Sequence, residues 1–69
     1  MAEHVYRLIE VVGSSKISSD DAVRNAIARA RKTVKNMRWF QVVETRGQID
    51  QEELAYWQVT LKIGFTMED

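Results

Sequence analysis

Three segments of the chain are rich in β-branched and aromatic residues, and between the first two the apolar spacing changes to a helical period. The pattern is clearest in LAYWQVTLKIGF, residues 54–65, where alternate positions are apolar: Ala55, Trp57, Val59, Leu61, Ile63 and Phe65. Successive side chains of a strand point to opposite faces, so this segment predicts a strand with one apolar face. Two more strands are predicted, one from residue 3 to a loop at 13–15 and one at 38–49, with a polar turn at 49–53.

A helix is predicted over about residues 19–35. Apolar residues recur there at helical spacing and form one stripe: Ala22, Val23, Ala26, Ile27, Ala30, Val34 and Met37. Ser18 or Ser19 suits the N-cap, and Ser18-x-x-Asp21 resembles a capping box with Asp in place of Glu or Gln. Asn36 is a typical C-terminal stop.

The predicted order is therefore β-α-β-β, in one domain over residues 1–69 and in the α+β class. A helical crossover makes the first two strands parallel, and a short turn makes the third antiparallel to the second. If the third strand lies between the other two, every neighbouring pair is antiparallel. One helix then covers one face of a three-stranded sheet.

Trp39 and Phe40 are adjacent in the second strand, so they cannot both face the core. We expect Phe40 and Val42 to face the helix. The opposite face would then carry Trp39, Gln41, Val43 and Thr45, together with Gln58 of the third strand. The inverse arrangement, with Trp39 inside, stays open, and a β-bulge between Trp39 and Arg46 would change the face of Arg46.

Ten basic and ten acidic residues give a formal net charge of +0 at pH 7. This balance argues against general nucleic-acid binding, which needs a basic surface, and against a polybasic membrane anchor. No apolar run approaches the ~20 residues of a membrane-spanning helix, and the N-terminal residues do not resemble a signal peptide. A cytoplasmic protein is the resulting expectation.

Cysteine is absent, which excludes disulfides and thiolate metal sites. His4, the single histidine, has no carboxylates clustered at ligand spacing, so we expect an exposed residue without a metal. A domain of this size buries only about 60% of its unfolded surface. Small chains usually need disulfides, a metal or partner subunits, so oligomerisation is the expected source of stability.

The sequence carries no arrangement typical of an active site. The serines cluster where a loop and a helix cap explain them, and no histidine follows to act as a base. The better candidate is a binding site made by Trp39 and Gln58. An indole can stack on a planar heteroaromatic ring, a glutamine amide offers donors and an acceptor to the ring's polar edge, and Arg46 would add a planar cation. The alternative, an interface tryptophan and a surface glutamine, stays open.

Three stretches resemble the dodecins, a family of small flavin-binding proteins. They are VYRLIEVVGSS, AVRNAIARARKTVKNMRWFQVVETRG and WQVTLKIGF, which together span nearly the whole chain. The resemblance implies a hollow homododecamer built from trimers, with flavins (riboflavin or FMN) bound in pairs between subunits. It implies that Trp39 stacks on the flavin ring, that Gln58 hydrogen-bonds its polar edge, and that Arg46 and Gln48 lie by the site. Some bacterial members also bind coenzyme A.

Two positions depart from the family pattern. Thr66 stands where some bacterial members have an arginine, and Arg38 stands where some relatives have an acidic residue. If that arginine holds a ligand phosphate in those relatives, we expect FMN to bind less tightly here. Arg38 is expected to alter the preference among riboflavin, FMN and larger flavins. The expected function is flavin storage and quenching without turnover. Its rivals are a small flavin reductase, for which the sequence has no dinucleotide fingerprint, and an interaction module without cofactor.

Overall fold

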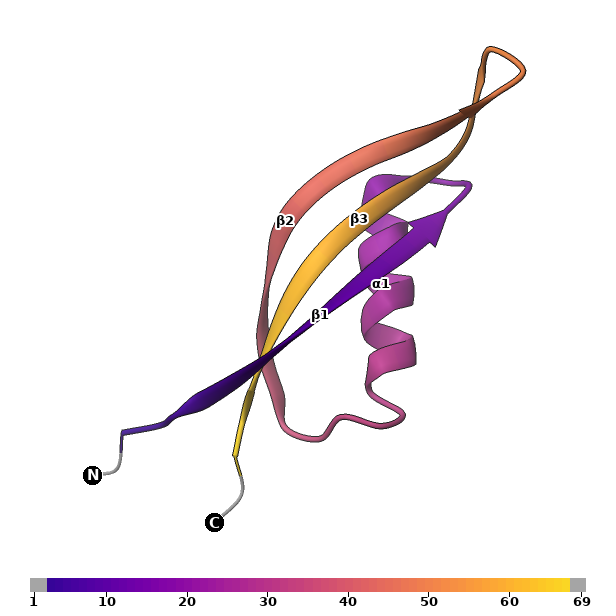
Figure 1. Cartoon of the computed structure of the whole chain (residues 1–69). Helices are drawn as coiled ribbons and strands as arrows, with labels where there is room; N and C mark the ends of the chain where they lie inside the picture. Colours follow the sequence, from indigo (N-terminus) through magenta and orange to yellow (C-terminus); the bar gives the residue numbers. More distant parts are fainter. Residues whose placement is uncertain (1–2, 68–69) are drawn as a thin grey trace.

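A computed structural model describes residues 3–67 of the chain. Within them lie β1 (Tyr6–Ser15), α1 (Ser19–Ala30), β2 (Met37–Asp50) and β3 (Glu53–Thr66), as Figure 1 shows. The predicted order β-α-β-β is confirmed. The first strand includes residues 13–15, which were expected to form a loop. The turn between β2 and β3 has only two residues, Gln51 and Glu52, both with positive φ, as in a type I′ hairpin.

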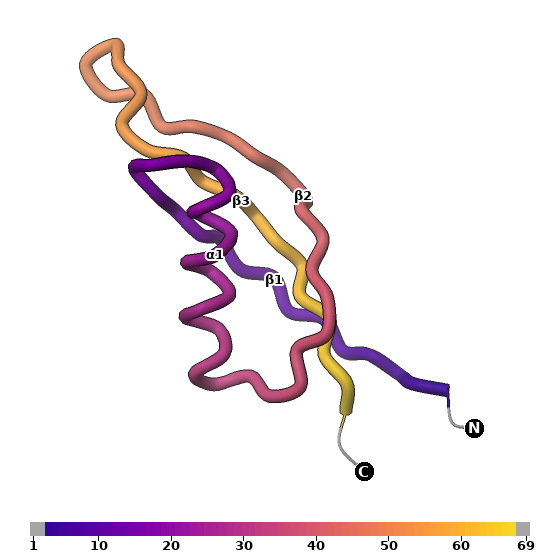
Figure 2. Tube along the Cα trace, turned by 180° about the vertical axis from the view of Figure 1, so that it is seen from behind, coloured from indigo at the N-terminus to yellow at the C-terminus, as the bar shows by residue number. Residues whose placement is uncertain are grey.

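The strand order in the sheet is β1-β3-β2, and both pairs are antiparallel. The third strand is therefore central, as predicted. Figures 1 and 2 show α1 along one side of the sheet and the β2–β3 hairpin extending beyond it. The described chain is elongated, with extents of 54 × 20 × 14 Å.

The start of α1 follows from its capping residues. The hydroxyl of Ser18 accepts a hydrogen bond from the backbone N–H of Asp21 at 3.0 Å, which confirms Ser18 as the N-cap. Asp20 and Asp21 lie in the first turn, where the helix dipole favours negative charge. The Asp21 carboxylate accepts a hydrogen bond from the hydroxyl of Ser15 at 2.7 Å, so the cap also ties α1 to the end of β1.

The end of α1 differs from the prediction, because the helix stops at Ala30 and not near residue 35. The next residues form a turn in which the backbone N–H and the hydroxyl of Thr33 both donate to the carbonyl of Ala30. Thr and Val at 33 and 34 are β-branched residues that disfavour continuation of the helix. Asn36 then takes a left-handed conformation (φ 65°), and Met37, expected in the helical stripe, begins β2.

The core lies between α1 and the middle of β3. Its buried apolar residues are Ala22, Ala26, Val59, Leu61 and Ile63. The two small alanines let the helix approach closely, and Gly13 of β1 completes the contact, because a Cβ there would collide with the carbonyl oxygen of Ala22. Each large side chain buried in this way contributes about 1.5–3 kcal/mol.

The second strand lies largely outside this core. Phe40 is opposite Ile63 and Val42 is opposite Leu61, so both are on the helix side of the sheet, as predicted. They remain 47% and 44% exposed, however, because α1 packs mainly on β1 and β3. Facing the helix is therefore not enough to bury Phe40 and Val42 in the single chain.

A β-bulge at Val43 decides the faces of the rest of β2. Val42 pairs with Leu61 and Glu44 pairs with Thr60, so Val43 is the extra residue between them. Beyond the bulge, Arg46 is opposite Gln58 and shares its face. Thr45 is opposite Val59, so the prediction that Thr45 shares the face of Trp39 is wrong.

Substitution of Gly13 by alanine is expected to lower the free energy of unfolding by about 3 kcal/mol, the upper part of the usual range for overpacking. The added Cβ would meet the backbone of α1 at Ala22 and lie 2.8 Å from the Cβ of Ala26. Gly47→Ala is the matched control, because its Cβ would meet only the movable end of Leu54 at 2.9 Å, and it should cost less than about 1 kcal/mol. Urea unfolding at one protein concentration measures both, and equal losses would contradict the close contact of α1 with β1.

Candidate functional site

The candidate site lies on the open face of the sheet, which we define as the face directed away from α1. All four residues expected at the site are on β2 or β3. The register places Trp39 opposite Gly64, Arg46 opposite Gln58 and Gln48 opposite Tyr56. Since Val59, Leu61 and Ile63 face α1, the neighbouring positions 58, 60, 62 and 64 belong to the open face.

The indole of Trp39 rests on the backbone of Gly64. A Cβ on Gly64 would lie 2.9 Å from Cδ2 of the indole and would collide with its Cε2 and Cζ2 atoms. The ring of Tyr6, from β1, meets the indole edge-on, with ring centroids 5.9 Å apart and an angle of 65° between the planes. Trp39 is thus held in place by two contacts and is still 41% exposed.

Arg46 and Gln58 form a hydrogen-bonded pair further along the same face. The Nε–H of Arg46 donates to Oε1 of Gln58 at 3.0 Å, and its Nη1 donates to Glu44 Oε1 at 2.9 Å and to Thr60 Oγ1 at 3.3 Å. These contacts fix the orientation of the Gln58 amide. Its NH₂ group and the second lone pair of Oε1 remain for a ligand. Gln48 lies two residues beyond Arg46, about 7 Å along the strand.

Trp39 and Gln58 share a face but are far apart within one chain. Trp39 is opposite Gly64, and six residues of β3 separate Gly64 from Gln58, which corresponds to about 20 Å of strand. The structure therefore groups Arg46, Gln48 and Gln58 and separates Trp39 from them.

Three residues that lie beside the predicted site residues were not predicted from the sequence. Gly64 and Tyr6 hold the indole, and a glycine within a strand is itself a signal of close approach. Lys16 follows β1 directly and lines a hollow of about 400 Å³ together with Tyr56 and Gln58. No sequence signal points to Lys16, because it comes near Gln58 only through the register of β1 on β3.

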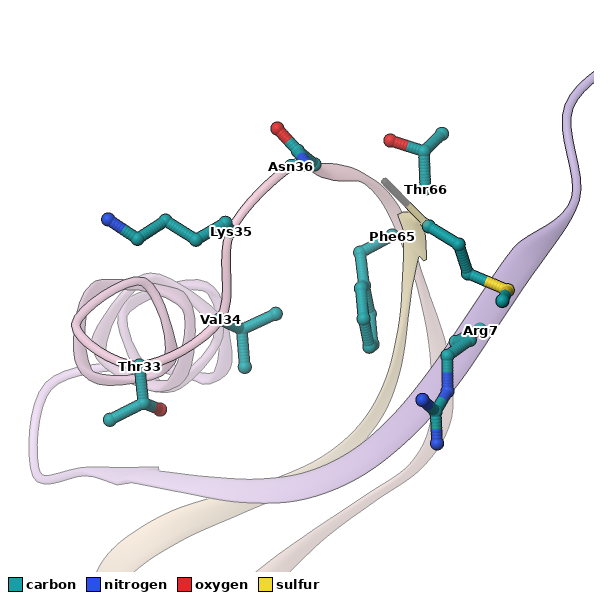
Figure 3. A pocket seen from close by; sticks show the side chains of 8 residues that line it. Arg7, Thr33, Val34, Lys35, Asn36, Phe65 and Thr66 are labelled. Carbon is teal, nitrogen blue, oxygen red and sulfur yellow. The ribbon is translucent and has the colours of Figure 1, made fainter. Parts of the chain in front are cut away.

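A second hollow, of about 380 Å³, lies between the end of α1 and the ends of β1 and β3. Figure 3 shows the ring of Phe65 and the side chain of Val34 facing it. Arg7 and Lys35 bring two positive charges to its rim, although the amine of Lys35 points away from Phe65. Thr66, where an arginine was noted in some relatives, is also part of the rim.

Residues 3–67 contain neither a cluster of metal ligands nor a membrane-spanning helix. Among residues 3–67 no three His, Cys, Asp or Glu side chains gather as metal ligands would. In the same part of the chain no helix has both the length and the apolar character needed to cross a membrane. His4 is exposed, as expected.

Comparison with known proteins decides the family. The family model described as Dodecin matches residues 5–68. The chain belongs to the dodecin family. Dodecins are small flavin-binding proteins, and the fold of this chain is theirs.

Individual dodecins are similar over almost their full length. The solved structure of the dodecin from Streptomyces coelicolor has 49% identity and a TM-score of 0.93, with 100% of this chain and 99% of that chain covered. The dodecin of Thermus thermophilus is 42% identical over 65 residues, 94% of each chain. A protein named calcium dodecin, from Mycobacterium tuberculosis, is 30% identical over 63 residues, 91% of this chain and 89% of that protein.

The contact between Trp39 and Gly64 can be tested by fluorescence. In a Trp57→Phe background, Trp39 is the remaining tryptophan. We expect Gly64→Ala to push the indole off the sheet and shift its emission to longer wavelength, because the ring becomes more hydrated. Gly47→Ala, on the same sheet but far from Trp39, should leave the emission unchanged. An unshifted spectrum in the Gly64 variant would show that the indole does not rest on this glycine.

Proposed function

We propose that this dodecin binds riboflavin or FMN by stacking the flavin ring on Trp39, and that it stores the flavin without turnover. The observation that carries the proposal is the half-exposed indole held on Gly64, on a sheet face that α1 leaves open. A large aromatic surface fixed in this way and left accessible is typical of a binding site.

The proposed site is shared between subunits. The separation of about 20 Å along the strand between the positions of Trp39 and Gln58 supports this, because it is longer than one flavin ring. We propose that Trp39 of one subunit stacks on the ring and that Gln58 of another subunit hydrogen-bonds its polar edge. Arg46 orients the Gln58 amide, and Gln48 lies beside it.

Storage is favoured over catalysis by what the residues offer. Bound flavin supplies a ring that light can excite, and an indole in contact with it can quench that excited state by donating an electron. A reductase would also need a nicotinamide site, and the sequence has no dinucleotide fingerprint. Rapid flavin reduction by NADH in the presence of the protein would favour the reductase instead.

Coenzyme A is the second ligand that we propose, in the hollow beside Phe65. Arg7 and Lys35 place two cations at its rim for phosphate groups, and Phe65 offers an aromatic surface. Thr66 contributes a hydroxyl there in place of a further positive charge. The cytoplasmic location expected from the sequence stays a prediction.

Loss of the Trp39 indole should remove most of the quenching. We expect wild-type protein in excess to quench the emission of riboflavin and FMN, and Trp39→Ala to abolish most of this effect. The affinity should fall by roughly tenfold or more, since each stacked aromatic contact is worth about 0.5–1.5 kcal/mol beyond its burial. Trp57→Phe is the matched control, because Trp57 is opposite Ser15 and Gly47, on the other face. Full emission at wild-type excess would contradict flavin stacking.

The assembly has its own test. Exposed apolar side chains on both faces of the sheet, among them Leu8, Val12, Phe40, Val42 and Val43, support extensive subunit contacts. We propose the homododecamer built from trimers that the family resemblance implies. Light scattering should then give a mass about twelve times that of the subunit, and a monomer or dimer at micromolar concentration would contradict it.

A further inference from the structure

We infer that Lys16 binds the phosphate group of FMN and thereby makes the flavin site selective for FMN over riboflavin. The inference rests on the proposed function, since it assigns the anionic end of a ligand whose ring edge is held by Gln58. It concerns the hollow beside Gln58, about 400 Å³ in volume and lined by Ser14, Ser15, Lys16, Tyr56 and Gln58.

The register of β1 on β3 brings Lys16 to the flavin-binding face. Ser14 is opposite Gln58, and Ser15 is opposite Trp57. Neighbouring strands of a sheet lie about 4.7–4.9 Å apart, so the end of β1 is directly beside Gln58. Lys16 continues from this end and is exposed. A ligand whose ring edge meets Gln58 therefore has its remaining substituents within reach of the Lys16 hollow.

Charge distinguishes Lys16 from the other cations on this face. The guanidinium of Arg46 is already paired with Glu44 at 2.9 Å. Lys62 has Glu10 directly opposite on β1. Among the described residues Lys16 forms no ion pair, and the lining of its hollow includes no carboxylate. Lys16 is therefore a cation beside Gln58 that is available to a ligand anion.

The hydroxyl groups around the hollow complete the donor set. Ser15 is already engaged, since its hydroxyl donates to Asp21 at 2.7 Å and accepts from the backbone N–H of Ile17 at 2.9 Å. Ser14 and Tyr56 also line the hollow and carry hydroxyls that can donate. An ammonium group with two hydroxyl donors suits a phosphate, whose oxygens accept charge-assisted hydrogen bonds. Riboflavin has no phosphate and gains nothing from this set.

The test compares two flavins that differ only in the phosphate. Full-length wild type and Lys16→Gln are titrated into riboflavin and into FMN, and the flavin emission is followed. We expect wild type to bind FMN more tightly than riboflavin. In Lys16→Gln the affinity for FMN should fall by about three- to tenfold, the size expected of a partly solvated ionic contact, while that for riboflavin stays within about twofold. Higher salt should weaken FMN binding to wild type and narrow the difference between the two flavins.

The control is Lys32→Gln, which removes the same charge from an exposed position in the turn that follows α1. It should leave the ratio of the two affinities at the wild-type value. Equal affinity of wild type for both flavins, or an equal loss for both in Lys16→Gln, would overturn the role of Lys16 and leave the proposed function intact. Failure of wild type to bind either flavin would instead overturn the proposed function.

Discussion

One short helix has to cover a much longer sheet, and the rest of the structure depends on this mismatch. The 12 residues of α1 span about 18 Å, whereas the 14 residues of each of β2 and β3 span about 46 Å. Only the middle of β3 and part of β1 can therefore be buried against the helix. The hairpin, most of β2 and the whole open face stay accessible in the single chain. These surfaces are the ones that partner subunits and a ligand can cover.

The central strand connects stability with the proposed function. On the side of α1 it carries Val59, Leu61 and Ile63, the three largest buried side chains. On the open face the alternate positions carry Gln58 and Gly64. Gln58 provides the polar end of the proposed site, and Gly64 supports the indole of Trp39 at its stacking end. Because the two sets alternate along one strand, the packing of α1 fixes the direction of both site residues. A shift of register by one residue would expose the core and bury the site together.

Residue chemistry and resemblance contributed differently to the prediction of the site. The alternation of side chains along the second strand correctly placed Trp39 on the face directed away from α1. It did not decide whether Trp39 binds a ligand or only lies in a subunit interface. Residue chemistry also named Arg46, and the resemblance to dodecins added Gln48. Only the bulge at Val43 explains why Arg46 reaches Gln58, since without it the side chain of Arg46 would face α1. Lys16 had no signal of either kind, because its neighbour on β3 is more than 40 residues away in the chain.

The sequence by itself determined the element order, the α+β class, an N-cap at Ser18 or Ser19 and the faces of β3. Each of these follows from residues close together in the chain, through periodicity and capping. The tertiary structure decided which strands α1 covers, the early end of α1, the bulge at Val43 and the seat of Trp39 on Gly64. These features depend on contacts between segments that are distant in the chain. The hydrogen-bond register between strands determines those contacts, and local sequence patterns do not encode that register.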